Sequence, residues 1–580
     1  MGSIQGGSPP TNGGSANSPN HPVSTPTAAD NQSFKPTACV ACREKHLKCD
    51  ALRTCTRCAV QGIPCVYLKS RRGYRGPNAS SRQICLSNAS DAGGAISEPT
   101  KVKPSSIALM PPVADDVISL SLDLPPVSNE ANSTGLYTRH YRPNYTHRCM
   151  EAFYQYFYNA HPFIPPRHQL LRVLKQTPME HLQTAISYVG SRYVPGAPIS
   201  SFALEFESYL LGNKPAPKDA SMVQAMLLFA LGLHGNNERK RAVEILVKAQ
   251  TLAIELGMSQ REYSLVNGRG SPTCEESLRR TWWELYVVSI MVAGFHGTGT
   301  FYHRDSLSNV PLPCEEDEFA SGCIPQLHTI EQFNEDSFED EDIMFSSYAY
   351  RIAAAQNLDR ILQSKDSLFP DDVALYQLEA HLTNWHLHLP DNKRDLFGQF
   401  GTLDEMLFQA HMIANVSSLL LYWDFSPLDG LAVRTITSCT EGSGVPAIGP
   451  TSDAVYTRRT IQAASNVSKL VTLPGPLVKH TQFFVCALAL SSIIHLSLWV
   501  KLPVMAQDHD LKQQIRINTG ALKAVASLWP SAGIGLKQVT MVAQNIYANR
   551  KDAAGEKFWR DFIEDDLMGE LIKGTVSIDT

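Results

Sequence analysis

Six cysteines between positions 39 and 65 form two copies of the spacing C-x2-C-x6-C. Thiolate sulfur binds zinc, and a closed structural zinc site usually has four ligands. Two zinc ions therefore need eight metal–sulfur bonds, which six thiolates supply only if two of them bridge the ions. The spacing favours a two-zinc cluster over a disulfide framework or a lone redox C-x2-C pair. The expected ligands are Cys39, Cys42, Cys49, Cys55, Cys58 and Cys65.

The same region is strongly basic. From Cys39 to Arg75, nine Lys and Arg residues and two acidic residues give a net charge of +7. Two zinc ions on six thiolates would reduce this charge to about +5. The rest of the chain carries 42 basic and 54 acidic residues, a net charge of −12. Such a basic island is expected where phosphate neutralisation is confined to one place, so we expect double-stranded DNA as a partner.

The two halves of the repeat differ in charge. The segment REKHLK after Cys42 is dense in cations, whereas AVQGIP after Cys58 is nearly uncharged and contains Gly62 and Pro64. The first half is therefore expected to contact DNA.

Residues 38 to about 75 resemble the DNA-binding module of the fungal binuclear zinc cluster transcription factors, in cysteine spacing and in basic side chains. The resemblance implies that Cys39 and Cys55 bridge the ions and that the other four cysteines are terminal ligands. It also implies that basic positions of the first half approach base edges of a CGG-type half-site in the major groove.

Carried over position by position, the resemblance makes Lys45 and His46 the base readers and places Arg43, Lys48 and Arg57 on phosphates. His46 departs from the family's usual Lys or Arg, and its charge near neutral pH is only partial. The inter-repeat loop DALRT also lacks the proline that many members carry.

A basic run follows the cluster, KSRRGYRGP. It fits a nuclear-import signal, an arm that contacts phosphates or a solvated tether. Its cations complete the set of candidate DNA contacts: Lys69, Arg71, Arg72 and Arg75.

The segments that flank the cluster have few apolar residues. Residues 1–36 are rich in Gly, Ser, Pro and Asn and are expected to form a disordered tail. They contain no apolar core of a signal peptide, which favours a reducing, intracellular compartment. Residues 76–144 are expected to be a disordered linker whose prolines interrupt any coiled-coil heptads. Within it, residues 117–124 alternate apolar and polar side chains, as in a short strand or a docking peptide.

Residues 145–550 contain long apolar-periodic segments with few strand signals. Three stretches, at 150–165, 221–259 and 276–294, resemble the fungal-specific regulatory domain that accompanies this zinc cluster. The resemblance implies an all-α regulatory domain that binds a small effector or a partner protein. We therefore predict a mainly α fold, with a small two-zinc domain at residues 37–75 and the helical domain at 145–550.

The three stretches predict particular helices. In the first, Phe153, Tyr156, Phe157 and Ala160 mark one face of a helix that ends at His161-Pro162. The second predicts two helices joined near Gly235, the latter presenting Val243, Leu246, Val247 and Ile254. In the third, Trp282 and Trp283 follow Arg279 and Arg280 and are expected in the core. The resemblance extends more loosely to later stretches and implies further helices near 344–364, 404–422, 483–500 and 510–530.

The apolar run 483–500 is long enough for a membrane-spanning helix to be considered. Its His495 and its small hydroxyl and thiol residues favour a buried helix. The sequence GFHGTG, residues 294–299, is expected to be a loop. The seven cysteines outside the repeat are scattered without ligand spacing and are expected to be core or surface thiols: Cys85, Cys149, Cys274, Cys314, Cys323, Cys439 and Cys486.

Two acidic segments, 331–345 and 559–572, interleave carboxylates with bulky apolar residues, as activation segments do. The C-terminal one, within an acidic tail at 551–580, is the better candidate. A last helix packed on the domain is the alternative.

The sequence lacks H-E-x-x-H, G-x-S-x-G and Walker-type glycine motifs, so no enzymatic activity is expected. We predict a nuclear, zinc-dependent, sequence-specific regulator of RNA polymerase II genes, an activator that recruits transcription machinery or coactivators. A small-molecule effector and a homodimer stay open, and no membrane partner is expected. The alternatives are a zinc-stabilised protein-interaction module or corepressor scaffold, and a sensor that uses the thiolates themselves for metal or redox chemistry.

Overall fold

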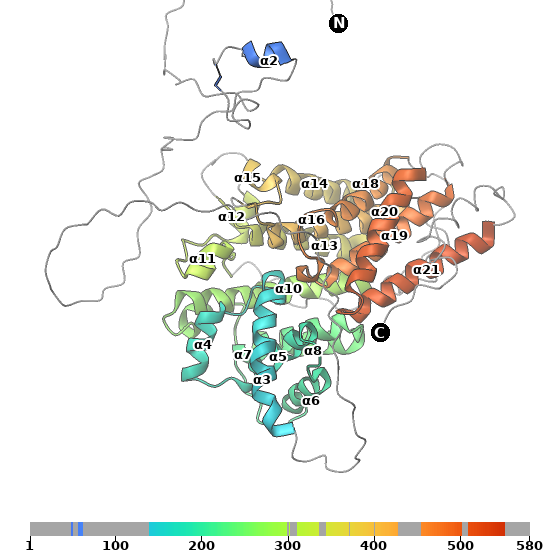
Figure 1. Cartoon of the computed structure of the whole chain (residues 1–580). Coiled ribbons are helices and arrows are strands. Elements are labelled where there is room, and N and C mark those ends of the chain that lie inside the picture. Colours follow the sequence, from blue (N-terminus) through green and yellow to red (C-terminus); the bar gives the residue numbers. More distant parts are fainter. Residues whose placement is uncertain are drawn as a thin grey trace, which may run out of the picture. The chain divides into compact units, whose positions relative to one another are not determined.

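A computed structural model describes residues 48–49, 56–61, 138–297, 301, 310–335, 344–370, 372–398, 401–426, 428, 454–501 and 508–550. The chain divides into two compact units, Met1–Leu109 and Met110–Thr580. In the described residues of the first unit, the regular element is the short helix α2, Thr56–Gln61. The second unit is helical (Figure 1). Its described residues contain no strand and only an isolated antiparallel bridge between Phe397 and Leu403.

The earlier helices of the second unit form its lower part in Figure 1. Helix α5 packs against α3, α6 and α7, and α7 packs against α8. Helix α10 contacts α7, α8 and α9 on one side and α13 on the other, so it joins the early and late helices. The bounds are α3 Thr138–Ala152, α4 Arg167–Gln176, α5 Glu180–Gly190, α6 Ile199–Leu210, α7 Ala220–Gly235, α8 Arg239–Glu255, α9 Arg261–Asn267 and α10 Pro272–His296.

The later helices pack in sequence order, α13 on α16, α16 on α18, α18 on α19, and α19 on both α20 and α21. Neighbours along the chain thus become neighbours in space, as is usual for helical domains. The bounds are α11 Glu316–Ser321, α12 Ile330–Glu335, α13 Ser347–Ser364, α14 Val373–Leu387, α15 Asp391–Arg394, α16 Glu405–Tyr422, α18 Ala454–Leu470, α19 Phe483–Lys501, α20 Asp508–Val525 and α21 Pro530–Arg550.

Capping residues explain where the longer helices begin. The side chains of Asp219, Ser346 and Asp404 each accept a hydrogen bond from the third backbone N–H that follows, at the starts of α7, α13 and α16. Ser271 does the same for α10, whose first residue is a proline. Gly297 ends α10 in the left-handed conformation, with φ of 61°. Such residues provide hydrogen-bond partners or a suitable backbone conformation at the helix ends, where the backbone N–H and C=O groups have no partner within the helix.

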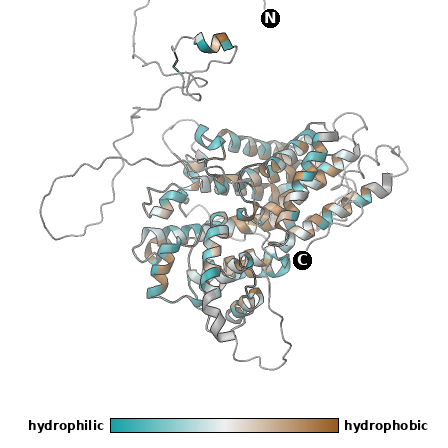
Figure 2. Cartoon of the chain, in the orientation of Figure 1, coloured by the Kyte–Doolittle hydropathy of each residue, from teal (hydrophilic) through white to brown (hydrophobic). Residues whose placement is uncertain are grey.

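One apolar core runs through the unit from Cys149 to Ala543, with a smaller cluster around Leu375 and Tyr422. Every residue of α7 is buried. In Figure 2 hydrophobic residues recur along the helices of this unit. Helix α19 is buried in the same way, because Ile494 and His495 have no exposed surface. In the described part of the chain, no helix has both the length and the apolar character that crossing a bilayer requires.

The predicted helices near 344–364, 404–422, 483–500 and 510–530 are confirmed as α13, α16, α19 and α20. The last of these ends at Val525, because Pro530 opens the next helix. Helices α7 and α8 meet near Gly235 as predicted, and Trp282 and Trp283 are fully buried as predicted. The prediction of a mainly α fold is therefore confirmed.

The aromatic segment after Met150 is less regular than predicted. Helix α3 continues as a π-turn over Phe153–Phe157 and a 3-10 turn over Tyr158–Ala160, then ends at His161. Phe153, Phe157 and Ala160 are buried as predicted, but Tyr156 is only partly buried. The wider π-turn rotates the residues that follow, so one regular helical face does not describe the segment.

The predicted buried face of α8 is wrong by about one residue. Val243, Val247 and Ile254 are half-buried, and only Leu246 of the predicted set is buried. The face in the core consists of smaller side chains interleaved with longer ones, namely Ala242, Ile245, Leu246, Ala249, Gln250, Leu252 and Ala253. The prediction placed the larger apolar side chains in the core. The close packing of α7 on α8 instead favours small residues such as alanine at the contact.

Two further predictions need correction. Gly294 and His296 belong to α10, so the expected loop at 294–299 begins only at Gly297. A Cβ on Gly294 would lie 3.2 Å from Leu358 Cδ2, so this glycine serves the close approach of α10 to α13. The acidic segment 331–345, predicted as a candidate activation segment, packs into the domain near both of its ends. Phe333 and Phe345 are buried, and their ring centroids lie 4.8 Å apart.

The N-terminal tail, the docking peptide at 117–124, most of the linker and the acidic tail at 551–580 lie outside the described residues, as do Cys85 and Cys439.

Candidate functional site

Helix α2 places one cysteine inward and its neighbours outward. Cys58 is 1 % exposed, whereas Val60, two residues later, is 82 % exposed. Arg57 is exposed, as is Lys48, and Cys49 is half-buried. A small unit that folded by burying apolar groups would turn the valine inward and not only the cysteine. Among the described residues of this unit, the buried side chain is that of Cys58.

The fit to zinc follows from this arrangement. A six-residue helix is too short to be stable alone, and a domain of this size usually needs disulfides or a metal. Cys49 and Cys58 belong to different copies of the cysteine repeat and carry the thiolates that a structural zinc site uses. The other candidate ligands, Cys39, Cys42, Cys55 and Cys65, lie outside the described residues. So do Arg43, Lys45, His46, Lys69, Arg71, Arg72 and Arg75.

Residues 37–74 match the family model of the fungal Zn(2)-Cys(6) binuclear cluster domain, and residues 150–386 match the fungal specific transcription factor domain. The chain is also 37 % identical to the C6 finger domain transcription factor iacK of Pestalotiopsis fici (strain W106-1 / CGMCC3.15140). That alignment covers 92 % of this chain and 84 % of the relative. The chain belongs to the fungal binuclear zinc-cluster transcription factors. No solved structure matches it.

As a binuclear zinc-cluster transcription factor, the chain binds two zinc ions and is a DNA-binding transcription regulator, not an enzyme. The zinc supplies the rigid frame that the small reading domain cannot build by burial. The three sequence stretches that predicted the regulatory domain, starting at Met150, Ser221 and Glu276, all lie inside the matched range.

The regulatory domain of this zinc-cluster factor contains a buried ionic centre at the start of α10. Arg280 has no exposed side-chain surface, and its Nε lies 2.9 Å from Glu276 Oε1. Its Nη1 reaches Glu316 at 2.6 Å and its Nη2 donates to the Cys314 carbonyl at 2.8 Å. Its guanidinium also lies over the ring of Phe319, at 4.0 Å from the centroid. Arg280 thus fastens the connection after α10 to the helix itself.

A second buried centre lies further along α10, at Glu284. Arg351 of α13 donates from both terminal nitrogens, at 2.6 and 2.9 Å, and His161 Nδ1 lies at 2.7 Å. Tyr348 donates to the same carboxylate. Burial alone would raise the pKa of Glu284, but the Arg351 charge and the hydrogen bonds from Arg351 and His161 hold that pKa well below its ordinary value. Glu284 is therefore an anion in the core.

His161 also links Glu284 to a hydroxyl. Its Nε2 lies 3.1 Å from Thr481 Oγ1, so hydroxyl, imidazole and carboxylate follow one another as in a nucleophile–base–acid relay. His161, Glu284 and Thr481 are each at most 2 % exposed. Arg351 neutralises the charge of the Glu284 carboxylate. The chain of hydrogen bonds ties α10 to the segment before α19.

Sequence reasoning did not identify these polar partners. His161, Glu284, Arg351 and Thr481 are separated by dozens to hundreds of positions, and only the fold brings them together. It also treated Cys486 as an isolated thiol, whereas the structure places it beside His234 and His296. No linear spacing signals either arrangement.

Proposed function

We propose that this regulator activates RNA polymerase II genes in the nucleus and reads CGG-type half-sites through the first helix of its zinc cluster. The observation that supports the proposal is the outward display of Lys48 and Arg57 around the inward-facing Cys58. Cations held on a metal-stiffened surface can follow the phosphate backbone and carry neighbouring side chains into the major groove. The relative iacK is itself described as a transcription factor.

In this proposal the six cysteines hold the two zinc ions, with Cys39 and Cys55 as the bridging thiolates. Lys45 and His46 contact base edges, and Arg43, Lys48 and Arg57 contact phosphates together with the arm at 69–75. Residues 37–75 act as the reading domain and residues 145–550 as the regulatory domain, joined by the linker at 76–144. The acidic tail at 551–580 recruits coactivators.

Binding of the full chain to a CGG-containing duplex and to a scrambled duplex tests the reading mechanism. We expect specific binding to be tighter by about 10³-fold or more and to weaken steeply with salt. Arg57→Ala should weaken binding to both duplexes and lower the slope of log K against log salt by about 0.9, because one phosphate contact is lost. Lys45→Ala should instead reduce discrimination between the duplexes. Equal affinity for the two duplexes would favour a protein-interaction module.

Fusing residues 551–580 to an unrelated DNA-binding domain tests the activation role. A reporter that stays silent with this fusion, while a known activation segment drives it, would contradict the assignment of the tail.

A further inference from the structure

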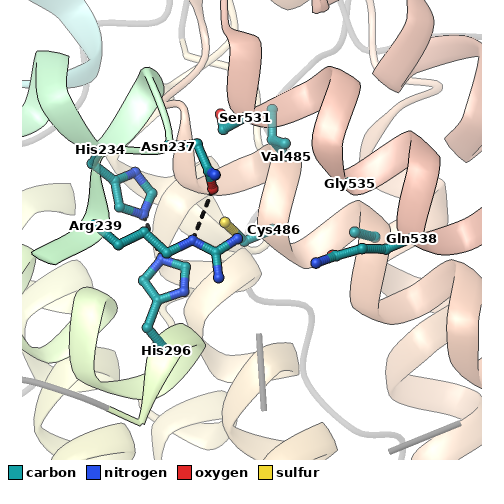
Figure 3. A pocket seen from close by; sticks show the side chains of 10 residues that line it. His234, Asn237, Arg239, His296, Val485, Cys486, Ser531, Gly535 and Gln538 are labelled. Atoms are coloured by element: carbon teal, nitrogen blue, oxygen red, sulfur yellow. Dashed lines mark hydrogen bonds between the residues drawn. The ribbon is translucent and has the colours of Figure 1, made fainter. Parts of the chain in front are cut away.

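Two histidines and a cysteine from three helices face one another inside the helical unit (Figure 3). His234 lies in the last turn of α7, His296 is the last residue of α10, and Cys486 lies in the first turn of α19. All three are buried. Their ligand atoms lie within 4.8 Å of one another, and the two Nε2 atoms are 2.8 Å apart. The fold thus gathers two nitrogen donors and one sulfur donor at a single point.

We propose that His234, His296 and Cys486 bind one thiophilic d10 cation, Cu⁺ or Zn²⁺, at a regulatory site separate from the zinc cluster. Imidazole nitrogen and thiolate sulfur are the ligands that these two cations prefer in proteins. The two rings share a hydrogen bond through the same nitrogens that would bind the ion.

The two rings have little polar contact with the rest of the described structure. Neither His234 Nδ1 nor His296 Nδ1 has a partner in the described structure. The bond between the two Nε2 atoms is therefore the polar contact that holds the rings, and it is the contact that a metal ion would replace. Imidazole binds a metal ion in its neutral form, through a ring nitrogen that carries no proton.

The space beside the rings is of a size that suits an ion. A cavity bordered by the three residues and by Ser531 and Gln538 of α21 leaves about 10 Å³ for the centre of a water molecule. This is about the space that one water needs. Two nitrogen ligands at about 2.0–2.1 Å from a tetrahedral ion lie about 3.3 Å apart, so the rings need to separate by roughly 0.5 Å. The cavity can accept that movement and one water ligand.

The helix ends around the site suit a cation bound by a thiolate. α7 and α10 both end at the site, and the negative ends of their dipoles favour positive charge there. α19 begins at the site, and the positive end of its dipole favours the anionic form of Cys486. Both effects act within the first or last helical turn, where the three side chains lie.

The positive charge of Arg239 disfavours a bound cation, and it therefore affects the relative affinities for Cu⁺ and Zn²⁺. Arg239 borders the cavity, with its Nε donating to Asn237 Oδ1 at 2.8 Å (Figure 3). With two neutral imidazoles and one thiolate, Cu⁺ gives a neutral site, whereas Zn²⁺ leaves a charge of +1 next to this guanidinium. We therefore expect Cu⁺ to bind more tightly than Zn²⁺.

Metal binding here would stabilise contacts between distant parts of the chain. His234 and His296 lie within the matched fungal specific transcription factor domain, at 150–386, and Cys486 lies beyond it. A metal bound to all three stabilises the arrangement of α7, α10 and α19, and binding only to the folded state raises its stability. The ion would thus couple metal supply to the state of the regulatory domain.

Counting metal ions in the full chain tests the site. After zinc loading the cluster accounts for two zinc ions, and a filled second site gives one further ion: a third zinc, or one copper after titration with Cu⁺ against a competing chelator. Cys486→Ser and His296→Gln should each lose that one equivalent while keeping two zinc ions and DNA binding. They should also lose the rise in unfolding temperature that metal gives the wild type. Arg239→Gln should bind Zn²⁺ several-fold tighter and change the affinity for Cu⁺ little, because only the zinc site carries a net charge for the guanidinium to repel.

Cys323→Ser is the matched control, because Cys323 is exposed and does not border the cavity. It should retain the extra ion. Circular dichroism verifies that each variant is folded, and the two site variants on different helices guard against misfolding of one of them. The proposal is wrong if wild type and site variants hold the same number of each metal and show the same unfolding temperatures. Its failure leaves the DNA-binding test unaffected.

Discussion

At the residue scale, the interior of the regulatory domain depends on charges that the fold neutralises in place. Glu284 and Arg351 are both buried and joined by two hydrogen bonds. Such a pair contributes little net stability compared with apolar residues, but removing one partner leaves the other charge buried and uncompensated. The same reasoning applies to Arg280 with Glu276.

We predict that Glu284→Gln lowers the free energy of unfolding by about 3–5 kcal/mol, because Arg351 keeps its charge in the core without a counterion. Urea unfolding of the full chain, followed by circular dichroism, measures the loss. The matched control is Glu151→Gln. Glu151 pairs with Arg167 at the surface, where the Glu151 side chain is 49 % exposed and the Arg167 side chain 43 %. That substitution should change stability by less than about 1 kcal/mol. Similar losses in the two variants would contradict the role assigned to burial.

Two other histidines, His495, which is buried, and His411, which is half-buried, predict a pH dependence. Burial lowers the pKa of His411 and that of His495 to about 4 each. In the unfolded chain the value is about 6.5, so above that pH both rings are neutral in either state. Between about pH 6.5 and 4 the unfolded chain binds protons that the folded chain does not, and stability falls by about 1.4 kcal/mol per pH unit for each histidine.

Urea midpoints of the full chain at pH 7.5, 6.5 and 5.5 should therefore decrease toward acid. His495→Gln should show a shallower decrease over the same interval. A midpoint that stays constant or rises below pH 6.5 would refute the prediction.

At the element scale, glycines set how closely helices approach. A Cβ on Gly190, at the end of α5, would lie 1.9 Å from the backbone oxygen of Cys149 in α3. No side-chain movement relieves a clash with backbone, so the two helices pack at this distance only with glycine.

We predict that Gly190→Ala destabilises the domain by about 1–3 kcal/mol, because α3 and α5 must separate. Gly520→Ala in α20 is the control, since a Cβ there meets nothing within 4 Å and the residue is exposed. An alanine in that open helical position should stabilise by about 0.5–1 kcal/mol. Thermal unfolding of both variants measures these opposite changes in stability. Equal changes would show that the close approach of α3 and α5 does not determine the effect of an alanine at position 190.

At the scale of the whole molecule, the chain has two compact units, Met1–Leu109 and Met110–Thr580, to which the proposed function gives DNA reading and regulation in turn. The first depends on metal–sulfur bonds and the second on a large apolar core. Damage to one unit should therefore leave the stability of the other nearly unchanged.

Accordingly, Cys58→Ala should abolish specific DNA binding while changing the unfolding free energy of the helical unit by less than about 0.5 kcal/mol. Duplex-binding assays and circular dichroism on the same preparation measure both quantities. A large fall in helical stability would show that the two units are energetically coupled.

The sequence alone determined the features that depend on local spacing. Two copies of C-x2-C-x6-C specify the metal cluster because ligand geometry depends on neighbours along the chain. The resemblance to the fungal regulatory domain likewise located α13, α16, α19 and α20 within a few residues, in a region whose apolar periodicity is a local property of the sequence.

Only the tertiary structure decided which distant polar groups meet. The bond between His161 and Glu284 spans 123 positions, and that between His161 and Thr481 spans 320. It also decided which face of α8 is buried and that α10 extends through Gly294. These features depend on how closely helices pack, and packing joins residues whose separation along the chain carries no periodic signal.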